Sequence, residues 1–392
     1  MRQESNPWGF INGLRGVLSL WVIAGHSLNV MNASLLQVSN PALAVDVFMI
    51  ISGFLMAIHF QERAAREPWE SPRTWFRFYL RRFMRIAPGY YVILAAALAL
   101  SASYASMRGV FYPESLPAPV AQVAASGESR FAFSWASALM HLSFLFGLSP
   151  RYAESVAAIP DWSIGLEMQF YAVFPFLMLG LRRFGNVAAG AATTAAVVLA
   201  HQLWGQYVGG QGVLGVFPQP TFLPLKLNWF ASGILIADSV ARRNQNNDAS
   251  AALSAGMALF LSFFSHSLTL PIVTFAFLVL AHRRHVESAL GWSALPARAL
   301  DRALDSRLGA FLADCSYSLY LLHLFALFPL ALYLRSVPGF SDHIPLAQAG
   351  ILFGCTVAVV LPASVAVHWL VERPGIEFGR RILRARSRTN SA

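Results

Sequence analysis

The chain has 392 residues, of which 56% are hydrophobic and 12% are charged. Soluble proteins carry about 25% charged residues, so this chain has too little charge to cover a soluble surface of its size. The high apolar content, with 30 Phe, also excludes a disordered chain. These observations predict an all-α protein, a helical bundle that crosses a membrane many times.

The basic charge balance does not indicate a nucleic-acid-binding protein. The formal net charge is +10, but almost all the basic residues are Arg in short stretches between apolar runs, as in the cytoplasmic loops of membrane proteins. The two cysteines, Cys315 and Cys355, lie inside apolar runs without metal-ligand spacing. We therefore expect buried free thiols, no bound metal and no nucleic-acid partner.

Ten apolar stretches approach the roughly 20 residues that a helix needs to cross a bilayer. They are residues 11–31, 42–60, 86–105, 164–181, 186–207, 223–241, 250–265, 267–282, 309–334 and 346–371. Ten spans with the N-terminus inside place 23 arginines in cytoplasmic segments and four outside. This asymmetry is typical of a cytoplasmic side, so we expect a plasma-membrane protein (bacterial inner membrane) with both termini in the cytoplasm.

An eleventh apolar stretch, residues 131–148, is interrupted by Ser and His. A crossing here would invert every later loop and put the arginine-rich tail outside. We therefore predict a non-spanning outer helix or a re-entrant piece within one long outer loop, residues 105–163. Pro113, Pro117, Pro119 and Pro160 break helices in this loop.

The two ends of the chain carry their own signals. The first apolar run lacks a small-residue cleavage site and contains Arg15 and His26, so we expect a retained helix rather than a signal peptide. Residues 1–378 form the predicted transmembrane domain. Residues 379–392 form a short basic tail, which we expect to lie on the anionic lipid of the cytoplasmic leaflet.

Ionisable residues inside the first two spans are costly and therefore candidates for function. Arg15 and His26 are eleven residues apart, which is three helical turns, so they share one face about 16 Å apart. The alternative is that Arg15 extends to the inner interface and His26 is a hydrogen-bonded packing residue. Asp46 opens the second span, where a helix cap is the favoured interpretation. Gly53 permits close approach of another backbone.

A cluster of arginines precedes the third span. Arg77, Arg81 and Arg85 are spaced four residues apart, with Arg82 beside them and aromatic residues between. This pattern predicts an interfacial amphipathic helix. The arginines are either a lipid-headgroup anchor or a docking site for phosphates, and the two interpretations are compatible.

Two later spans carry polar stripes. Ser163, Glu167 and Tyr171 follow Trp162 at helical spacing and form an inward-facing stripe. A buried glutamate is hard to explain by packing, so function is favoured. Ser316, Tyr320 and His323 share one face of the ninth span, although a tyrosine and a histidine so placed can also satisfy each other between helices.

Seven sequence blocks in this order resemble the acyltransferase 3 family of integral-membrane acyltransferases. They cover residues 8–378 and comprise Gly13-Leu14-Arg15-Gly16 with His26, Val45-Asp46-Val47-Phe48 through Ser52-Gly53-Phe54-Leu55, Arg81-Arg82 through Arg85-Ile86 and Pro88, Trp162-Ser163 with Glu167, Phe170-Tyr171 and Pro175, Phe230 with Gly233, Ser316-Tyr317-Ser318 with Tyr320 and His323, and Glu372-Arg373-Pro374. The resemblance implies ten spans, a cytoplasmic acyl-CoA donor and transfer of a short acyl group, most often acetyl, to a glycan hydroxyl. It also implies that Arg15 and His26 are the hallmark pair.

The residue chemistry fits this expectation. Acyl transfer needs a base for the hydroxyl proton, a role suited to His26, and positive charge at the thioester oxyanion. We expect the nucleotide on Arg77, Arg81, Arg82 and Arg85, and the pantetheine arm passing Arg15. Glu167 would orient His26 or the acceptor, which is a carbohydrate or a glycosylated metabolite. An acyl-histidine intermediate stays open.

The competing class is a transporter or flippase, because buried Arg, His and Glu also form proton relays. The arginine-rich helix and the lack of internal repeats speak against it.

Overall fold

The computed structural model describes residues 8–112, 134–153, 156–205, 212–264, 267–291 and 295–388. These residues form helices and connecting turns, with no strand among them. Pro113, Pro117, Pro119, Arg130 and the end of the basic tail lie outside the described residues.

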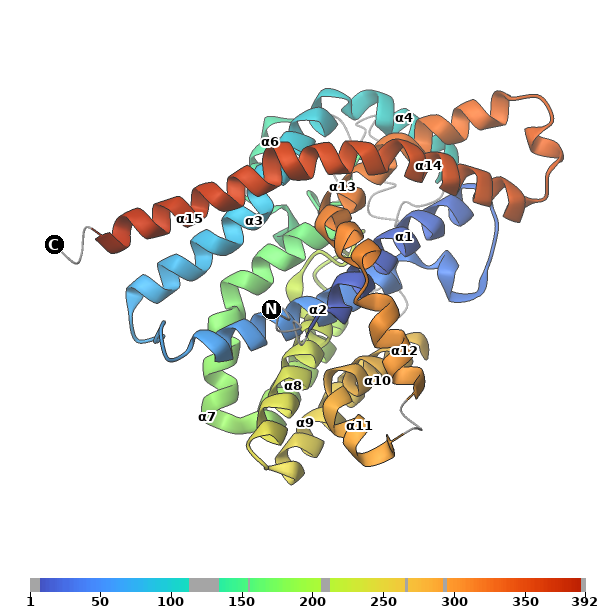
Figure 1. Ribbon diagram of the computed structural model, residues 1–392. Helices are drawn as coiled ribbons and strands as arrows, with labels where there is room; N and C mark the ends of the chain where they lie inside the picture. Colours follow the sequence, from blue (N-terminus) through green and yellow to red (C-terminus); the bar gives the residue numbers. More distant parts are fainter. Residues whose placement is uncertain are drawn as a thin grey trace.

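The ten predicted apolar stretches fall in nine helices of the described residues, one of which is broken into two halves. Figure 1 shows how these helices are arranged. The first five spans lie in α1 (Phe10–Val30), α2 (Pro41–Arg63), α3 (Pro72–Ala99) and the two halves of α7 (Trp162–Trp204). The last five lie in α8 (Leu227–Asn244), α9 (Asp248–Ser262), α10 (Thr269–Ala281), α13 (Arg307–Ser336) and α14 (Pro345–Val367).

By length and composition, four helical stretches can cross a membrane: Pro41–Arg63, Trp162–Trp204, Arg307–Ser336 and Pro345–Ala385. The bent pair of α3 and α4 (Ser101–Phe111) passes the same test together. Helices α9 and α10 are apolar but only 15 and 13 residues long. The all-α membrane bundle is confirmed, whereas the count of ten spans stays a prediction.

Helix α7 is two helices joined at a sharp turn. Gly185 has φ of 83°, a left-handed conformation that glycine adopts without steric cost. The turn falls between the two predicted spans at 164–181 and 186–207. The break in α7 therefore separates the two apolar stretches that hydropathy predicts.

The amphipathic arginine helix and the third span are one continuous helix, α3, rather than two elements. Pro88 lies inside α3, and the chain bends by 80° between Ala99 and Ser101 into α4. The predicted third span, 86–105, is therefore wrong at its end, because residues 101–111 turn away as a separate helix.

The apolar stretch at 131–148 does not span a membrane in the described residues. From Ser134 onward it forms α6 (Trp135–Leu142) and the 3-10 turn η2 (Phe146–Leu148). Eight helical residues extend about 12 Å, well short of the roughly 30 Å hydrocarbon core.

The remaining elements connect and extend the bundle. Three are 3-10 turns, η1 (Leu36–Ser39), η3 (Leu223–Leu225) and η5 (Phe340–Asp342), and two are short amphipathic helices, α11 (Arg283–Leu290) and α12 (Leu295–Leu304). A π-helical turn, η6 (His368–Glu372), joins α14 to α15 (Arg373–Arg388). The long rod of α14 and α15 crosses the top of the bundle in Figure 1, with α15 against α3.

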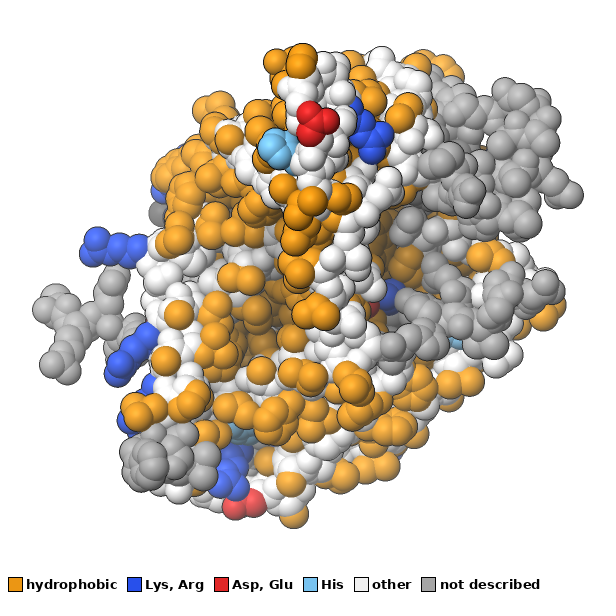
Figure 2. Space-filling view, turned by 90° about the vertical axis from the view of Figure 1, so that its right-hand side faces the viewer, with side chains coloured by type: hydrophobic (Ala, Val, Ile, Leu, Met, Phe, Trp, Pro, Cys, Tyr) orange, Lys and Arg blue, Asp and Glu red, His pale blue; other side chains and the backbone are white. Residues whose placement is uncertain are grey.

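Helices α1 and α2 form the centre of the bundle. α1 packs against α13, α2 and α14, and α2 packs against α8 (Figure 1). Large apolar side chains remain exposed on the outer helices, for example Phe176, Ile272 and Val359. Figure 2 shows one such face, on which hydrophobic side chains predominate. An apolar exterior of this extent is suited to lipid rather than water.

Candidate functional site

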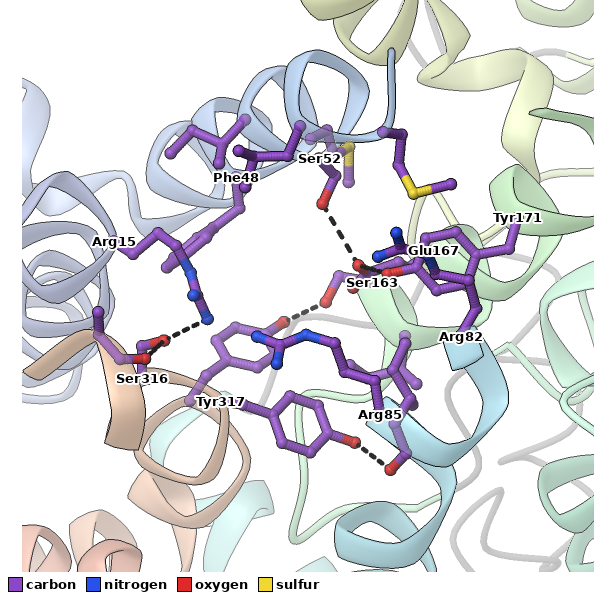
Figure 3. Close-up of a pocket in the computed structure, with 18 of the residues that line it drawn as sticks. Arg15, Phe48, Ser52, Arg82, Arg85, Ser163, Glu167, Tyr171, Ser316 and Tyr317 are labelled. Carbon is purple, nitrogen blue, oxygen red and sulfur yellow. Dashed lines mark hydrogen bonds between the residues drawn. The ribbon is translucent and has the colours of Figure 1, made fainter. Parts of the chain in front are cut away.

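A cavity between α1, α2, α3, α7 and α13 has a volume of about 400 Å³. This size is within the range of small-molecule sites. We call it the arginine cavity, because Arg15, Arg82 and Arg85 line it (Figure 3). Ser163, Glu167, Tyr171, Ser316 and Tyr320 also line it. The stripe predicted on α7 and two of the three residues predicted on α13 therefore face one space, whereas His323 lines neither this cavity nor the second one described below.

The three arginines retain capacity to bind a ligand. Arg15 Nη2 donates a hydrogen bond to Ser316 Oγ at 2.8 Å. The Arg82 guanidinium lies 5.7 Å from the Tyr171 ring centre, and its buried Nε has no hydrogen-bond partner among the described residues. Within those residues no ion pair joins any of the three to a carboxylate. Guanidinium groups of this kind suit a phosphate or carboxylate ligand.

Glu167, Glu372 and Asp314 are the carboxylates that line the arginine cavity, and the first two are held by hydroxyl groups and a histidine. Glu167 accepts hydrogen bonds from the Tyr171 hydroxyl and, at 3.3 Å, from Ser52 Oγ (Figure 3). Glu372 accepts one from Ser318 Oγ, and its Oε2 lies 3.1 Å from His368 Nδ1. Hydroxyl groups and His368 therefore fix the positions of these two carboxylates.

The four arginines predicted as one phosphate surface do not all line the arginine cavity. Arg82 and Arg85 line the cavity, whereas Arg81 makes two hydrogen bonds to Glu67, at 2.6 and 2.9 Å. Partial burial would raise the pKa of Glu67, but the hydrogen bonds and charge of Arg81 lower it below its usual value. Arg77 is half-buried outside the cavity. The stripe of every fourth residue is therefore divided between two environments.

His26 lines a second cavity of about 260 Å³, which we call the histidine cavity. Trp162, Asn29, Gln219 and Arg108 are among its other lining residues. Arg15 and His26 thus project into different cavities from the same helix, and Glu167 lies with Arg15 rather than with His26. Of the two roles expected of Glu167, orienting His26 has no contact to support it among the described residues.

Val45 and Tyr320 line both cavities and separate them. The Tyr320 hydroxyl donates to the Pro160 carbonyl at 2.7 Å and accepts from Ser163 Oγ at 2.9 Å. His323 hydrogen bonds to the backbone carbonyl of Tyr320 and not to its hydroxyl. The two side chains therefore do not simply satisfy each other, which was the alternative left open for this pair.

Asp46 lies outside both cavities and is not a helix cap. It is five residues inside α2 and forms a buried ion pair with Lys226, whose Nζ lies 2.9 and 3.0 Å from the two carboxylate oxygens. The interpretation as a cap is therefore wrong. A buried carboxylate needs a cation when it has no access to water.

Two polar cavities thus lie within a bundle of apolar helices. Comparison with known proteins gives the same family as the sequence blocks. A family model described as an acyltransferase domain matches residues 8–369. The chain belongs to the acyltransferase 3 family. Together with its apolar helices, this membership makes it an integral membrane protein.

Several curated relatives are similar to this family member. Peptidoglycan O-acetyltransferase OatA of Listeria monocytogenes is 28% identical over 181 residues, which is 45% of this chain and 25% of OatA. Exopolysaccharide production protein ExoZ of Rhizobium meliloti is 25% identical over 342 residues, 86% of this chain and 90% of ExoZ. Protein 2 in the picA locus of Rhizobium radiobacter is 29% identical over 174 residues, 44% of this chain and 83% of that protein. No solved structure matches the chain.

Sequence reasoning missed several residues that line the arginine cavity of this family member. His59, Asp314 and His368 line it, and Tyr317 and Glu372, which also line it, were singled out only as parts of the family blocks. Each is ionisable or polar and lies within or at the edge of an apolar run. That position alone could have marked them as candidates. No group of three or more metal-ligating side chains occurs within the described ranges.

Proposed function

We propose that the protein is an O-acyltransferase that moves a short acyl group, acetyl in the simplest case, from acyl-CoA to a hydroxyl of a glycan or a glycosylated metabolite. The observation that carries the proposal is the pair of cavities, one lined by three arginines and one by His26, that meet at Val45 and Tyr320. The family and the names of OatA and ExoZ support the reaction class and a polysaccharide acceptor.

The donor is proposed to enter the arginine cavity from the cytoplasm. Arg82 and Arg85 would bind its phosphates through charge-assisted hydrogen bonds, which are about twice as strong as neutral ones. The pantetheine arm would pass Arg15, whose guanidinium is oriented by Ser316, and bring the thioester to Tyr320. Glu167, held by Tyr171 and Ser52, would orient the arm.

The acceptor is proposed to enter the histidine cavity. Asn29, Gln219 and Trp162 offer amide groups and an aromatic ring, a combination that fixes the orientation of a polar ligand. His26 would take the proton of the acceptor hydroxyl as its oxygen bonds to the thioester carbonyl carbon. The C–S bond then breaks, and the protonated His26 returns the proton to the leaving thiolate, so that CoA leaves as a thiol.

The test is acceptor-dependent release of CoA by the purified protein. The protein in lipid nanodiscs is incubated with labelled acetyl-CoA and isolated surface polysaccharide, and both free thiol and label on the polysaccharide are measured. General-base assistance is worth about 10²–10⁴-fold, so His26→Ala and His26→Gln are expected to reduce turnover by at least about 10²-fold with donor binding retained.

Two results would contradict the proposal. A protein that moves glycan across the bilayer without releasing CoA is a transporter or flippase. If His26→Gln is fully active, the histidine is structural and the base must be sought elsewhere. Thermal stability of each variant in detergent is the control for folding.

A further inference from the structure

A second imidazole lies beside His26. The rings of His26, on α1, and His323, on α13, have centres 5.1 Å apart and planes inclined by 32°. His323 has no exposed surface. An idle polar ring at such a position would cost free energy, because buried polar groups are normally hydrogen-bonded.

The hydrogen bond of His323 determines its tautomer. His323 Nδ1 lies 2.6 Å from the backbone carbonyl oxygen of Tyr320. A carbonyl oxygen only accepts, so Nδ1 carries the proton, and Nε2 of the neutral ring is an acceptor. That Nε2 is buried and has no hydrogen-bond partner among the described residues.

His26 also has a ring nitrogen without a hydrogen-bond partner among the described residues. Its Nδ1 is buried and likewise lacks a partner within the described residues, while the ring lines the histidine cavity. Nε2 is therefore the nitrogen that can meet an acceptor hydroxyl. If Nε2 takes the proton, Nδ1 must already carry one, because a neutral imidazole has one protonated nitrogen.

Two charged groups also line the histidine cavity. Arg108 lines it, but a guanidinium only donates. Asp161 also lines it, but its Oδ2 accepts from the Tyr90 hydroxyl at 3.0 Å and lies 2.7 Å from His141 Nδ1. His323 contributes an acceptor without a partner among the described residues, its Nε2, on a ring adjacent to that of His26.

We propose that His323 is the positioning residue for His26: its Nε2 accepts the Nδ1–H of His26 and so directs the bare Nε2 of His26 at the acceptor hydroxyl. This rests on the proposed function, in which His26 is the base. The resulting chain runs from His26 through His323 to the Tyr320 carbonyl. It serves the purpose of the third group in a hydrolase triad, which holds a histidine in one tautomer. Such hydrogen bonds tighten when substrate binds.

The kinetic test compares two amides at position 323. The oxygen of Gln reaches the place of imidazole Nε2, whereas the shorter Asn reaches only the place of Nδ1. His323→Asn is expected to lower kcat about 10- to 100-fold, the effect of losing one hydrogen bond to a group that becomes charged. KM for donor and acceptor should change less than about twofold, since binding is untouched. His323→Gln should recover most of the rate.

The matched control is His282→Asn. His282 is a half-buried histidine hydrogen-bonded to Ser239 Oγ at 2.9 Å, away from both cavities. We expect this variant to keep the kcat of the parent protein. A loss of kcat equal to that of His323→Asn would mean that the effect is structural and would overturn the proposal.

A spectroscopic readout is independent of turnover. In protein labelled with ¹⁵N-histidine, the His26 signals are identified by their absence from His26→Gln. The parent protein and His323→Gln should show His26 protonated at Nδ1, and His323→Asn should show loss of that preference. If His323→Asn does not fold, the His323→Gln spectrum decides, and a proton on Nε2 of His26 there contradicts the proposal.

The outcomes separate this inference from the function on which it rests. A fully active His26→Gln overturns the assignment of the base. An inactive His26→Gln together with a fully active His323→Asn overturns only the role of His323.

Discussion

At the scale of single residues, ionisable groups inside this bundle are either paired or face a cavity. Asp46 and Lys226 are buried against each other, and Asp161 is held by His141 and Tyr90. Arg15, Arg82 and Arg85 instead face the arginine cavity. Because an unpaired charge in a membrane costs several kcal/mol, the two kinds of environment distinguish structural charges from those available for a ligand.

This distinction predicts unequal effects of the arginines of α3. Arg82→Gln and Arg85→Gln should each raise KM for acyl-CoA about 10-fold or more, since a hydrogen bond to a charged group is worth about 1.5–3 kcal/mol. Arg77→Gln should leave KM unchanged, because Arg77 lies outside the cavity. Initial-rate kinetics with varied acyl-CoA check this. An increase in KM from Arg77→Gln equal to that from Arg82→Gln would instead support binding of the donor by all four arginines.

At the scale of elements, the position of α2 depends on a close crossing with α8. Gly53 of α2 faces the backbone carbonyl of Phe230, and Gly233 of α8 faces that of Ile50. A Cβ atom at either glycine would overlap a backbone atom that cannot rotate away. Small residues permit helices to approach closely in a membrane, and here they bring the Ser52 side of α2 into the arginine cavity.

We expect Gly53→Ala to destabilise the bundle by about 1–3 kcal/mol, the usual cost of overpacking. Gly180→Ala is the matched control, since nothing lies within 4 Å of a Cβ at this helical glycine of α7. Alanine favours a helix over glycine by up to about 1 kcal/mol, so the control should be as stable as the parent or more so. Thermal unfolding in detergent measures the stability of both variants. Equal stability would contradict the close contact between α2 and α8 at Gly53.

At the scale of the whole molecule, arginine-bearing segments gather on one side. In Figure 1 the N-terminal end of α3, the turn within α7 and the α8–α9 connection lie at the lower left. The α1–α2 and α13–α14 connections lie at the right. Which of these sides faces the cytoplasm stays a prediction from the distribution of arginines along the sequence.

The orientation can be tested with two single cysteines in a Cys355→Ser background, because Cys315 is buried. Leu36→Cys lies in the exposed α1–α2 connection and Gln245→Cys in the exposed α8–α9 connection. A membrane-impermeant maleimide added to intact cells should modify the cysteine at 36. The cysteine at 245 should react only after permeabilisation. The reverse pattern would invert the topology.

The sequence by itself was sufficient for the helices, the family and most of the polar residues of the site. Hydropathy indicated a bundle of apolar helices and a break between residues 181 and 186, where α7 turns at Gly185, because burial of backbone polar groups in lipid leaves few alternatives to a helix. The motifs around Arg15 and Glu167 identified the family that the comparison supports. These signals are local, so a single chain is enough to read them.

Which residues meet was decided only by the tertiary structure. Asp46 and Lys226 are 180 positions apart, and His26 and His323 are brought together by the packing of α1 against α13. Helical spacing put Arg15 and His26 on one face, yet Tyr320 and Val45 separate them into two cavities. Spacing along one helix determines which side chains point in the same direction. Whether two side chains share a cavity depends on what the neighbouring helices place between them.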